Sequence, residues 1–196
     1  NPTVLNGQPT IRGMRLTDLQ LQFTKARDLT PLQGMPLGVL ALNSTPVADI
    51  SALKGMPLVQ LYLEKTAVSE ISALKGIALQ ELNLAGTQAS DISALEGAPL
   101  TSLYLHGTRV ADITALHGMP LKILRLDNCR RLQDLSPLAE CKQLEYLSLP
   151  ALHKDIEFLR SFPNLKRISY TLPQGPWETA RPTLAEFWKA YDARKK

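Results

Sequence analysis

The chain has 196 residues, a net charge of +4, 44% hydrophobic residues and only 6% aromatic residues. No stretch approaches the roughly 20 apolar residues of a membrane-spanning helix, and no low-complexity linker divides the sequence. The basic residues are spread thinly, with residues 36–120 mildly acidic and residues 121–196 basic, so the dense basic stripe of a nucleic-acid-binding protein is missing. We therefore expect one domain that inserts into no membrane and binds no nucleic acid.

Residues 1–15 are expected to form an N-terminal cap, because the first repeated unit would otherwise leave apolar side chains and a strand edge open. Residues 10–12 and 14–22, which extend from this region into the first repeat, are expected to pair as a hairpin around Gly13. Since the chain begins at Asn1 with neither an initiator Met nor a signal peptide, we expect a mature product or a piece of a longer one.

Residues 27–131 contain one 21-residue pattern five times in succession. A unit this short cannot close a hydrophobic core alone, so its apolar side chains must pack between neighbouring copies, as in a stacked solenoid. Paired apolar residues in period-two alternation predict a short strand in each unit, with the paired residues pointing inward. Eight such pairs occur: Leu19/Leu21, Leu40/Leu42, Leu61/Leu63, Leu82/Leu84, Leu103/Leu105, Leu124/Leu126, Leu147/Leu149 and Ile168/Tyr170.

The loops between the strands also recur in register. A threonine follows each early strand at the same distance (Thr24, Thr45, Thr66, Thr87 and Thr108), and Cys129 and Leu152 replace it later. We expect this column to satisfy backbone groups in a tight turn. The Asp and the Ser of the pattern Asp-Ile-Ser-x-Leu can each cap a single 3₁₀ turn, and a recurrent Gly allows the corner that follows.

After the repeats, residues 173–196 are expected to form a C-terminal capping helix and tail. Thr183 and Glu186 have the spacing of a capping box, and Leu184, Phe187, Trp188 and Tyr191 fall on one helical face. This apolar face predicts a lid on the last repeat, and a docking helix for a partner is the alternative.

The pattern L-x-x-L-x-L-x-x-[T/C]-x-V-x-D-I-x-x-L resembles the leucine-rich repeat family, in its short-repeat bacterial subclass that includes internalin-like and SDS22-like proteins. The resemblance covers residues 16–172 and implies an α/β solenoid with about eight parallel strands on a concave face and 3₁₀ turns on a convex face. The segments at both ends of the chain are also similar to those that flank repeats attached to bacterial serine/threonine kinases.

The sequence contains no phosphate-binding glycine loop, no metal-ligand spacing and no nucleophile motif. The three histidines, His106, His117 and His153, fall on different faces of the coil, and His106 is expected beside Asp127 as a solvated pair. We therefore predict no catalytic residue, metal or cofactor. Cys129 and Cys141 are expected to be reduced thiols, which is compatible with a cytoplasmic protein.

The register assigns three columns of side chains to the strand face. The residue between the paired leucines gives Gln20, Ala41, Tyr62, Asn83, Tyr104, Arg125, Ser148 and Ser169. Two residues earlier lie Asp18, Val39, Gln60, Glu81, Ser102 and Ile123, followed by Glu145 and Lys166 or their neighbours. On the other side lie Gln22, Asn43, Glu64, Ala85, His106 and Asp127.

These columns predict a partner-binding face in the middle of the array. Its candidate residues are Tyr62, Glu64, Glu81, Asn83, Tyr104, His106, Arg125 and Asp127. Tyr and Arg are enriched at binding hot spots, although exposed Tyr also stabilises a sheet by packing across strands. At the edge after the strands, Arg109, Arg130 and Arg131 either bind an acidic group or form a solvated basic edge.

Three functional hypotheses follow. The first is a non-enzymatic scaffold that binds a protein partner through the concave strand face. The second is a sensory or substrate-recruiting domain of a larger bacterial serine/threonine kinase, and the third is a structural repeat array without a specific ligand. The pattern predicts no oligomeric state and no particular partner.

Overall fold

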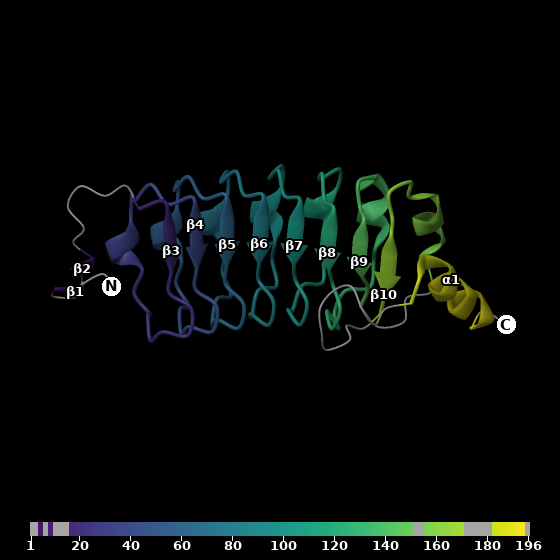
Figure 1. Ribbon diagram of the computed structural model, residues 1–196, viewed down its shortest axis with the longest axis horizontal. Helices are drawn as coiled ribbons and strands as arrows, with labels where there is room; N and C mark the ends of the chain where they lie inside the picture. The colour runs from purple at the N-terminus through teal and green to yellow at the C-terminus, as the bar shows by residue number, and fades with distance from the viewer. Residues whose placement is uncertain (1–3, 6–7, 10–15, 151–154, 171–181, 195–196) are drawn as a thin grey trace.

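The computed structural model describes residues 4–5, 8–9, 16–150, 155–170 and 182–194. Figure 1 shows an elongated coil in which successive strands lie side by side in chain order and a helix lies beyond the last strand. Eight strands form one parallel sheet in the order β10-β9-β8-β7-β6-β5-β4-β3. The expected solenoid with eight parallel rungs is thereby confirmed.

Each strand of this sheet has three residues and occupies the predicted place in its repeat. Their bounds are β3 (Asp18–Gln20), β4 (Val39–Ala41), β5 (Gln60–Tyr62), β6 (Glu81–Asn83), β7 (Ser102–Tyr104), β8 (Ile123–Arg125), β9 (Tyr146–Ser148) and β10 (Arg167–Ser169). The central leucine of each strand pairs with the central residue of the next, as Leu82 pairs with Leu103. Identical side chains therefore stack in continuous ladders through the core.

The core runs the length of the coil between the strands and the return segments. Leu61, Leu82, Leu103 and Leu124 on the strands are all 0% exposed. The return segments bury one branched or leucine side chain at each equivalent position, such as Ile92, which is 2% exposed. Because the apolar side chains of each rung are buried against those of its neighbours, no rung has a core of its own.

A 3₁₀ turn lies in each return segment, on the side of the coil opposite the strands. The turns are η1 (Thr30–Leu32), η2 (Ser51–Leu53), η3 (Ser72–Leu74), η4 (Ser93–Leu95), η5 (Thr114–Leu116), η6 (Ser136–Glu140) and η7 (Glu157–Ser161). In η4 the Asp91 carboxylate accepts the Ser93 backbone N–H at 2.8 Å, so the aspartate caps the turn as predicted. The Ser part of that prediction is wrong: the Ser136 hydroxyl, for example, donates to the Asp134 carboxylate at 2.9 Å and caps no backbone group.

The threonine column is structural, as the sequence predicts. Thr24, Thr45, Thr66, Thr87 and Thr108 each donate their Oγ1 hydrogen to the carbonyl oxygen three residues earlier, over 2.7–2.8 Å. In the next rung the Cys129 thiol instead donates to the Leu105 carbonyl at 3.1 Å. Cys129 and Cys141 are both free and buried, whereas Leu152 lies outside the described residues.

The register shifts once, after β8. Tyr146 and Arg167 continue the column that starts at Asp18, because Tyr146 pairs with Ile123 and Arg167 pairs with Tyr146. The neighbours of Glu145 and Lys166, and not those two residues, therefore occupy the strand face. The cause is the longer unit between β8 and β9, in which both the loop before η6 and η6 itself are longer than in the central units.

Both ends of the array carry further elements. At the N-terminus, β1 (Val4–Leu5) and β2 (Gln8–Pro9) form an antiparallel pair. The hairpin predicted for residues 10–12 and 14–22 is a different pairing. Residues 10–15 lie outside the described residues, and β3, which belongs to its second arm, pairs in parallel with β4. The division into an N-terminal cap, repeats and a C-terminal cap, with its boundaries, remains a prediction.

The C-terminal helix α1 (Leu184–Ala193) begins with the predicted capping box between Thr183 and Glu186. Phe187, Trp188 and Tyr191 are buried, and the Phe187 ring lies 5.2 Å from that of Tyr170, directly after β10. The aromatic face of α1 is therefore a lid on the last rung. With 10 residues, α1 is the longest helix described, and none of the described helices is suited by length and hydropathy to span a bilayer.

Candidate binding face

A strip of four side chains crosses the middle of the strand face at right angles to the strands. Tyr62 pairs with Asn83, Asn83 with Tyr104, and Tyr104 with Arg125, each on the next strand. All four are partly exposed. With neighbouring strands about 4.8 Å apart, the strip is roughly 15 Å long.

The N-terminal half of the strip combines an aromatic ring with carboxylates. Burial and the neighbouring Glu81 carboxylate raise the pKa of Tyr62 to about 12, so its phenol keeps its proton and remains a hydrogen-bond donor. Gln60 donates to the same Glu81 carboxylate at 3.5 Å. This contact between adjacent rungs fixes the position of the negative charge beside the ring.

Asn83 and Glu64 are held by a second group of hydrogen bonds. The Asn83 side chain donates to the Glu64 carboxylate at 3.4 Å and accepts the Ala85 backbone N–H at 2.9 Å. Lys65 forms an ion pair with the same Glu64 carboxylate at 3.2 Å. Because both side chains are tied to neighbouring groups, they would lose little conformational freedom on binding a partner.

The C-terminal half of the strip rests on a buried charged network. Asp127 is 4% exposed, accepts a hydrogen bond from the Ser148 hydroxyl at 2.5 Å and contacts Arg125 at 3.4 Å. The side chain of Arg125 is itself only 14% exposed. Asp127 therefore lies behind the surface and positions Arg125, so it offers little contact area to a partner.

His106 lies in this half but is not part of a solvated pair with Asp127. Its Nδ1 atom is buried without a hydrogen-bond partner. Burial lowers the pKa of His106, and the Arg125 guanidinium lowers it further, so the imidazole is neutral near pH 7. Tyr104, in the same half, has its pKa raised by burial and by Glu81 and likewise remains protonated.

The sequence did not identify the burial of two serines in the central column or the support that Ser148 gives to Asp127. Ser148 and Ser169 fall in the column that we expected to face outward, yet they are 0% and 5% exposed. Ala41 is also fully buried, between Gln20 and Tyr62 on the adjacent strands. The small side chains in this column are therefore buried although alternation places them on the outer face, which the register alone does not reveal.

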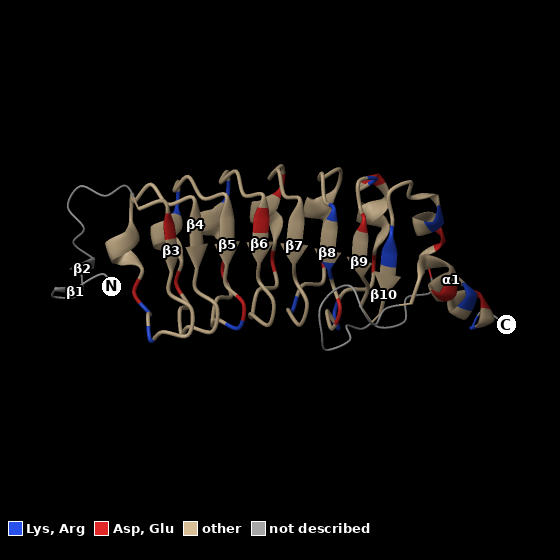
Figure 2. Ribbon diagram, in the orientation of Figure 1, with Lys and Arg blue, Asp and Glu red and all other residues tan. Residues whose placement is uncertain are grey.

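The charges on the strand face are separated along the array. Figure 2 shows acidic residues on β3 and β6 and basic residues on β8 and β10, which include Asp18, Glu81, Arg125 and Arg167. A partner surface with the opposite order of charges would be complementary to this face.

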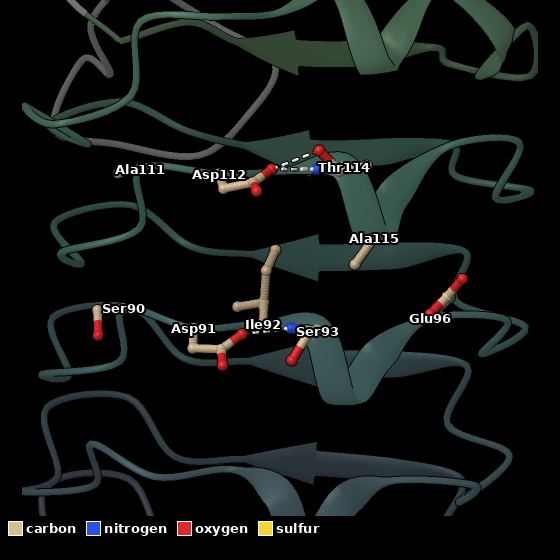
Figure 3. Close-up of a pocket in the computed structure, with 9 residues that line it drawn as sticks. All are labelled: Ser90, Asp91, Ile92, Ser93, Glu96, Ala111, Asp112, Thr114 and Ala115. Atoms are coloured by element: carbon tan, nitrogen blue, oxygen red, sulfur yellow. Dashed lines mark hydrogen bonds between the residues drawn. The ribbon is translucent and has the colours of Figure 1, made fainter.

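The opposite face carries a hollow between η4 and η5, shown in Figure 3. Asp91 and Asp112 line it, but their carboxylates bond to the turns of Ser93 and Thr114. Within the described ranges, no three His, Cys, Asp or Glu side chains gather in a way that could hold a metal ion. We assign no ligand to this hollow.

The sequence matches no family model and no curated protein sequence. The structure, however, is similar to internalin C2 from Listeria monocytogenes, with a TM-score of 0.74, 31% sequence identity, and coverage of 78% of this chain and 70% of the internalin. It is also similar to the internalin InlF from the same organism, with a TM-score of 0.61, 26% identity and coverage of 79% of this chain and 54% of that one.

A third similar structure is a leucine-rich repeat protein of Leptospira interrogans, with a TM-score of 0.58, 22% identity and coverage of 90% of this chain and 46% of the other. This last likeness concerns the fold alone. The chain spans about half the length of the InlF and Leptospira structures. The repeated pattern, the single parallel sheet and the likeness to internalin C2 lead to one conclusion: the chain belongs to the leucine-rich repeat family.

Proposed function

We propose that this chain is a non-enzymatic scaffold that binds a protein partner through its strand face. The contact surface consists of Tyr62, Glu64, Glu81, Asn83, Tyr104, His106 and Arg125, with Asp127 supporting it from behind. The observation that carries the proposal is the row Tyr62, Asn83, Tyr104 and Arg125 on four consecutive strands. Two Tyr and one Arg in one row are the residue types that dominate binding energy at protein interfaces.

The rigidity of the face supports this proposal. The backbone of each rung is bonded to the next beyond the strands as well, as when the Leu84 N–H donates to the Tyr104 carbonyl at 2.9 Å. A surface whose backbone is fixed before binding loses little entropy on association. The strip is open and extended, a shape that suits another protein surface better than an enclosed small molecule.

The two internalins support the same class of function, because they share this repeat architecture at 31% and 26% identity. A role as the recruiting domain of a bacterial serine/threonine kinase remains a prediction. The experiment below also tests the third hypothesis, that the chain is a structural array without a specific ligand.

A display library of protein fragments from the source organism, selected on the immobilised chain, tests the proposed face. We expect enriched fragments to lose roughly tenfold or more in affinity on the Tyr62→Ala and Tyr104→Ala variants, the loss typical of aromatic hot spots. Lys75→Ala, an exposed change beside η3 on the opposite side, is the matched control.

Fragments that bind the two tyrosine variants as tightly as the unmodified chain would show that another surface is used. Enrichment of no fragment at all would favour the structural array. Thermal unfolding of each variant separates a lost contact from a lost fold.

A further inference from the structure

A hollow of about 450 Å³ lies at the edge of the coil, between the loops that follow β7 and β8. It is lined by Gly107, Thr108, Arg109, Asn128, Arg130 and Arg131. All three arginines are exposed. The hollow is separate from the tyrosine strip, because its residues belong to the loops and not to the strand face.

The hollow exists because a backbone ladder ends here. Along this edge the N–H of one loop donates to the preceding loop, from Ala67 to Val47, Gln88 to Val68 and Arg109 to Ala89, over 2.8–3.0 Å. In the next loop the Arg130 N–H instead donates to the Asn128 carbonyl at 2.9 Å. The additional residue beside Arg130 and Arg131 therefore diverts the loop away from its neighbour.

The positive charge in the hollow is uncompensated. Within the described part of the chain, no ion pair involves Arg109, Arg130 or Arg131. The carboxylates that follow three residues later are engaged elsewhere: Asp112 with Thr114 and Asp134 with Ser136. Three arginines thus line one small space without an ion pair to an acidic neighbour.

This charge is a local feature and not part of the repeat. The positions equivalent to Arg109 in the three preceding rungs hold Pro46, Ala67 and Gln88. The fold does not need an arginine here, because those rungs form the same turn without one. The basic residues therefore occur where the loop departs from its neighbour.

We propose that this hollow binds a phosphate group. Guanidinium groups present paired N–H donors that match the oxygens of phosphate, often in bidentate contacts. A phosphate monoester carries about −1.5 to −2 charges at pH 7, which suits three arginines better than a singly charged carboxylate or sulfate ester does.

Titration of the 196-residue chain with phenyl phosphate, followed by NMR of the arginine Nε–H groups at constant ionic strength, tests the site. We expect shifts of the Arg109, Arg130 and Arg131 signals, and binding at least about fivefold tighter than that of phenyl sulfate, which has the same shape but one charge fewer. Inorganic phosphate distinguishes the source: equal affinity indicates free phosphate, and weaker affinity indicates an ester on a larger molecule.

The triple variant Arg109→Gln/Arg130→Gln/Arg131→Gln is expected to lose roughly tenfold or more in affinity for phenyl phosphate, since charge-assisted hydrogen bonds are lost together. The control Lys25→Gln/Lys54→Gln/Lys75→Gln removes the same net charge from exposed positions elsewhere and should bind as the unmodified chain does. Equal loss in both variants, or equal binding of phenyl sulfate and phenyl phosphate, would overturn the proposal and indicate only a general attraction of anions.

Discussion

The rungs from β4 to β8 and the last two rungs with α1 are stabilised in different ways. The central rungs repeat the same contacts: a leucine ladder through Leu61, Leu82 and Leu103 and, from β4 to β7, a threonine hydroxyl in the turn after each strand. The last rungs use contacts that occur once, such as the Arg160 guanidinium, which lies 4.1 Å from the centre of the Trp188 ring and forms ion pairs with Asp192 and Glu157.

This difference shows how an open array can end. A repeated ladder always leaves an unpaired copy at its end, so the last rung needs a partner with another shape. Here aromatic rings on α1 fill that role, because a large flat ring covers more of an exposed leucine ladder than another leucine would. The regular rungs therefore form the extended strand face, and the irregular rungs with α1 cover the C-terminal end of the core.

The change Leu103→Ala tests the regular part and should have the largest effect. Leu103 is fully buried and stacks between Leu82 and Leu124, so truncation leaves a cavity at the centre of the ladder. We expect a loss of about 3–5 kcal/mol in the free energy of unfolding, measured by urea denaturation. Leu103→Met, which nearly conserves volume, should cost less than about 1.5 kcal/mol.

Hydrogen exchange then shows whether the ladder acts as one unit. Faster exchange on both sides of β7 in the Leu103→Ala variant is the expected result, because each rung stabilises its two neighbours. Faster exchange confined to β7 would contradict the picture of a shared core.

The change Phe187→Ala tests the cap and should have a smaller effect. The ring is 5% exposed and contacts Tyr170, Trp188 and Tyr191. We expect a loss of about 3 kcal/mol, at the lower end of the range for a buried ring, because helix α1 lies at one end and can repack. Hydrogen exchange should accelerate in β10 while β5 and β6 keep their protection; Lys189→Ala, an exposed change on α1, is the control.

If Phe187→Ala lowers protection equally from β4 to β10, the array unfolds as one unit and the cap has no separate role. The comparison between centre and end would then be wrong.

Most of the fold could be predicted because the repeat reports the register many times over. The same leucine spacing occurs in five consecutive units and was sufficient to predict that Leu82 and Leu103 are buried, as the structure shows. The prediction weakened after Arg131, where one unit has extra residues and Tyr146, not Glu145, reaches the strand face. A single irregular unit carries no internal copy against which its register can be checked.

The candidate site was predicted less completely than the fold. Register placed Tyr62, Tyr104 and Arg125 on one face and in one row. It did not show that Asp127 and Ser148 form a buried support under Arg125, because burial on this face depends on the size of neighbouring side chains. The alternation of apolar and polar residues along a strand predicts which side chains face the core. Only the structure shows which of the outward-facing side chains are exposed and which are buried beneath their neighbours.

A column of acidic caps along the repeats gives the smallest predicted effect. The pKa of Asp91 is lowered from 3.8 by hydrogen bonds from the Ser93 backbone and hydroxyl, and that of Asp112 by Thr114 in the same manner. A lowered pKa in the folded chain adds stability above pH 3.8, and this is lost as the pH falls through the folded value. Tm should therefore decline below about pH 4.

The double variant Asp91→Asn/Asp112→Asn should decline less steeply over the same range, because an amide oxygen still accepts the Ser93 and Thr114 N–H but does not titrate. Glu96→Gln, which removes a nearby exposed carboxylate, is the control variant. Caps of this kind recur at Asp28, Asp49 and Asp134, so the repeated part of the coil contributes to the acid slope. Glu186 of α1, whose pKa is lowered by hydrogen bonds from Thr183, adds to that slope at the C-terminal end. If Tm declines equally steeply in the double variant, the groups that destabilise the fold at acid pH lie outside these caps. The repeated aspartates would then stabilise the turns without determining how stability depends on pH.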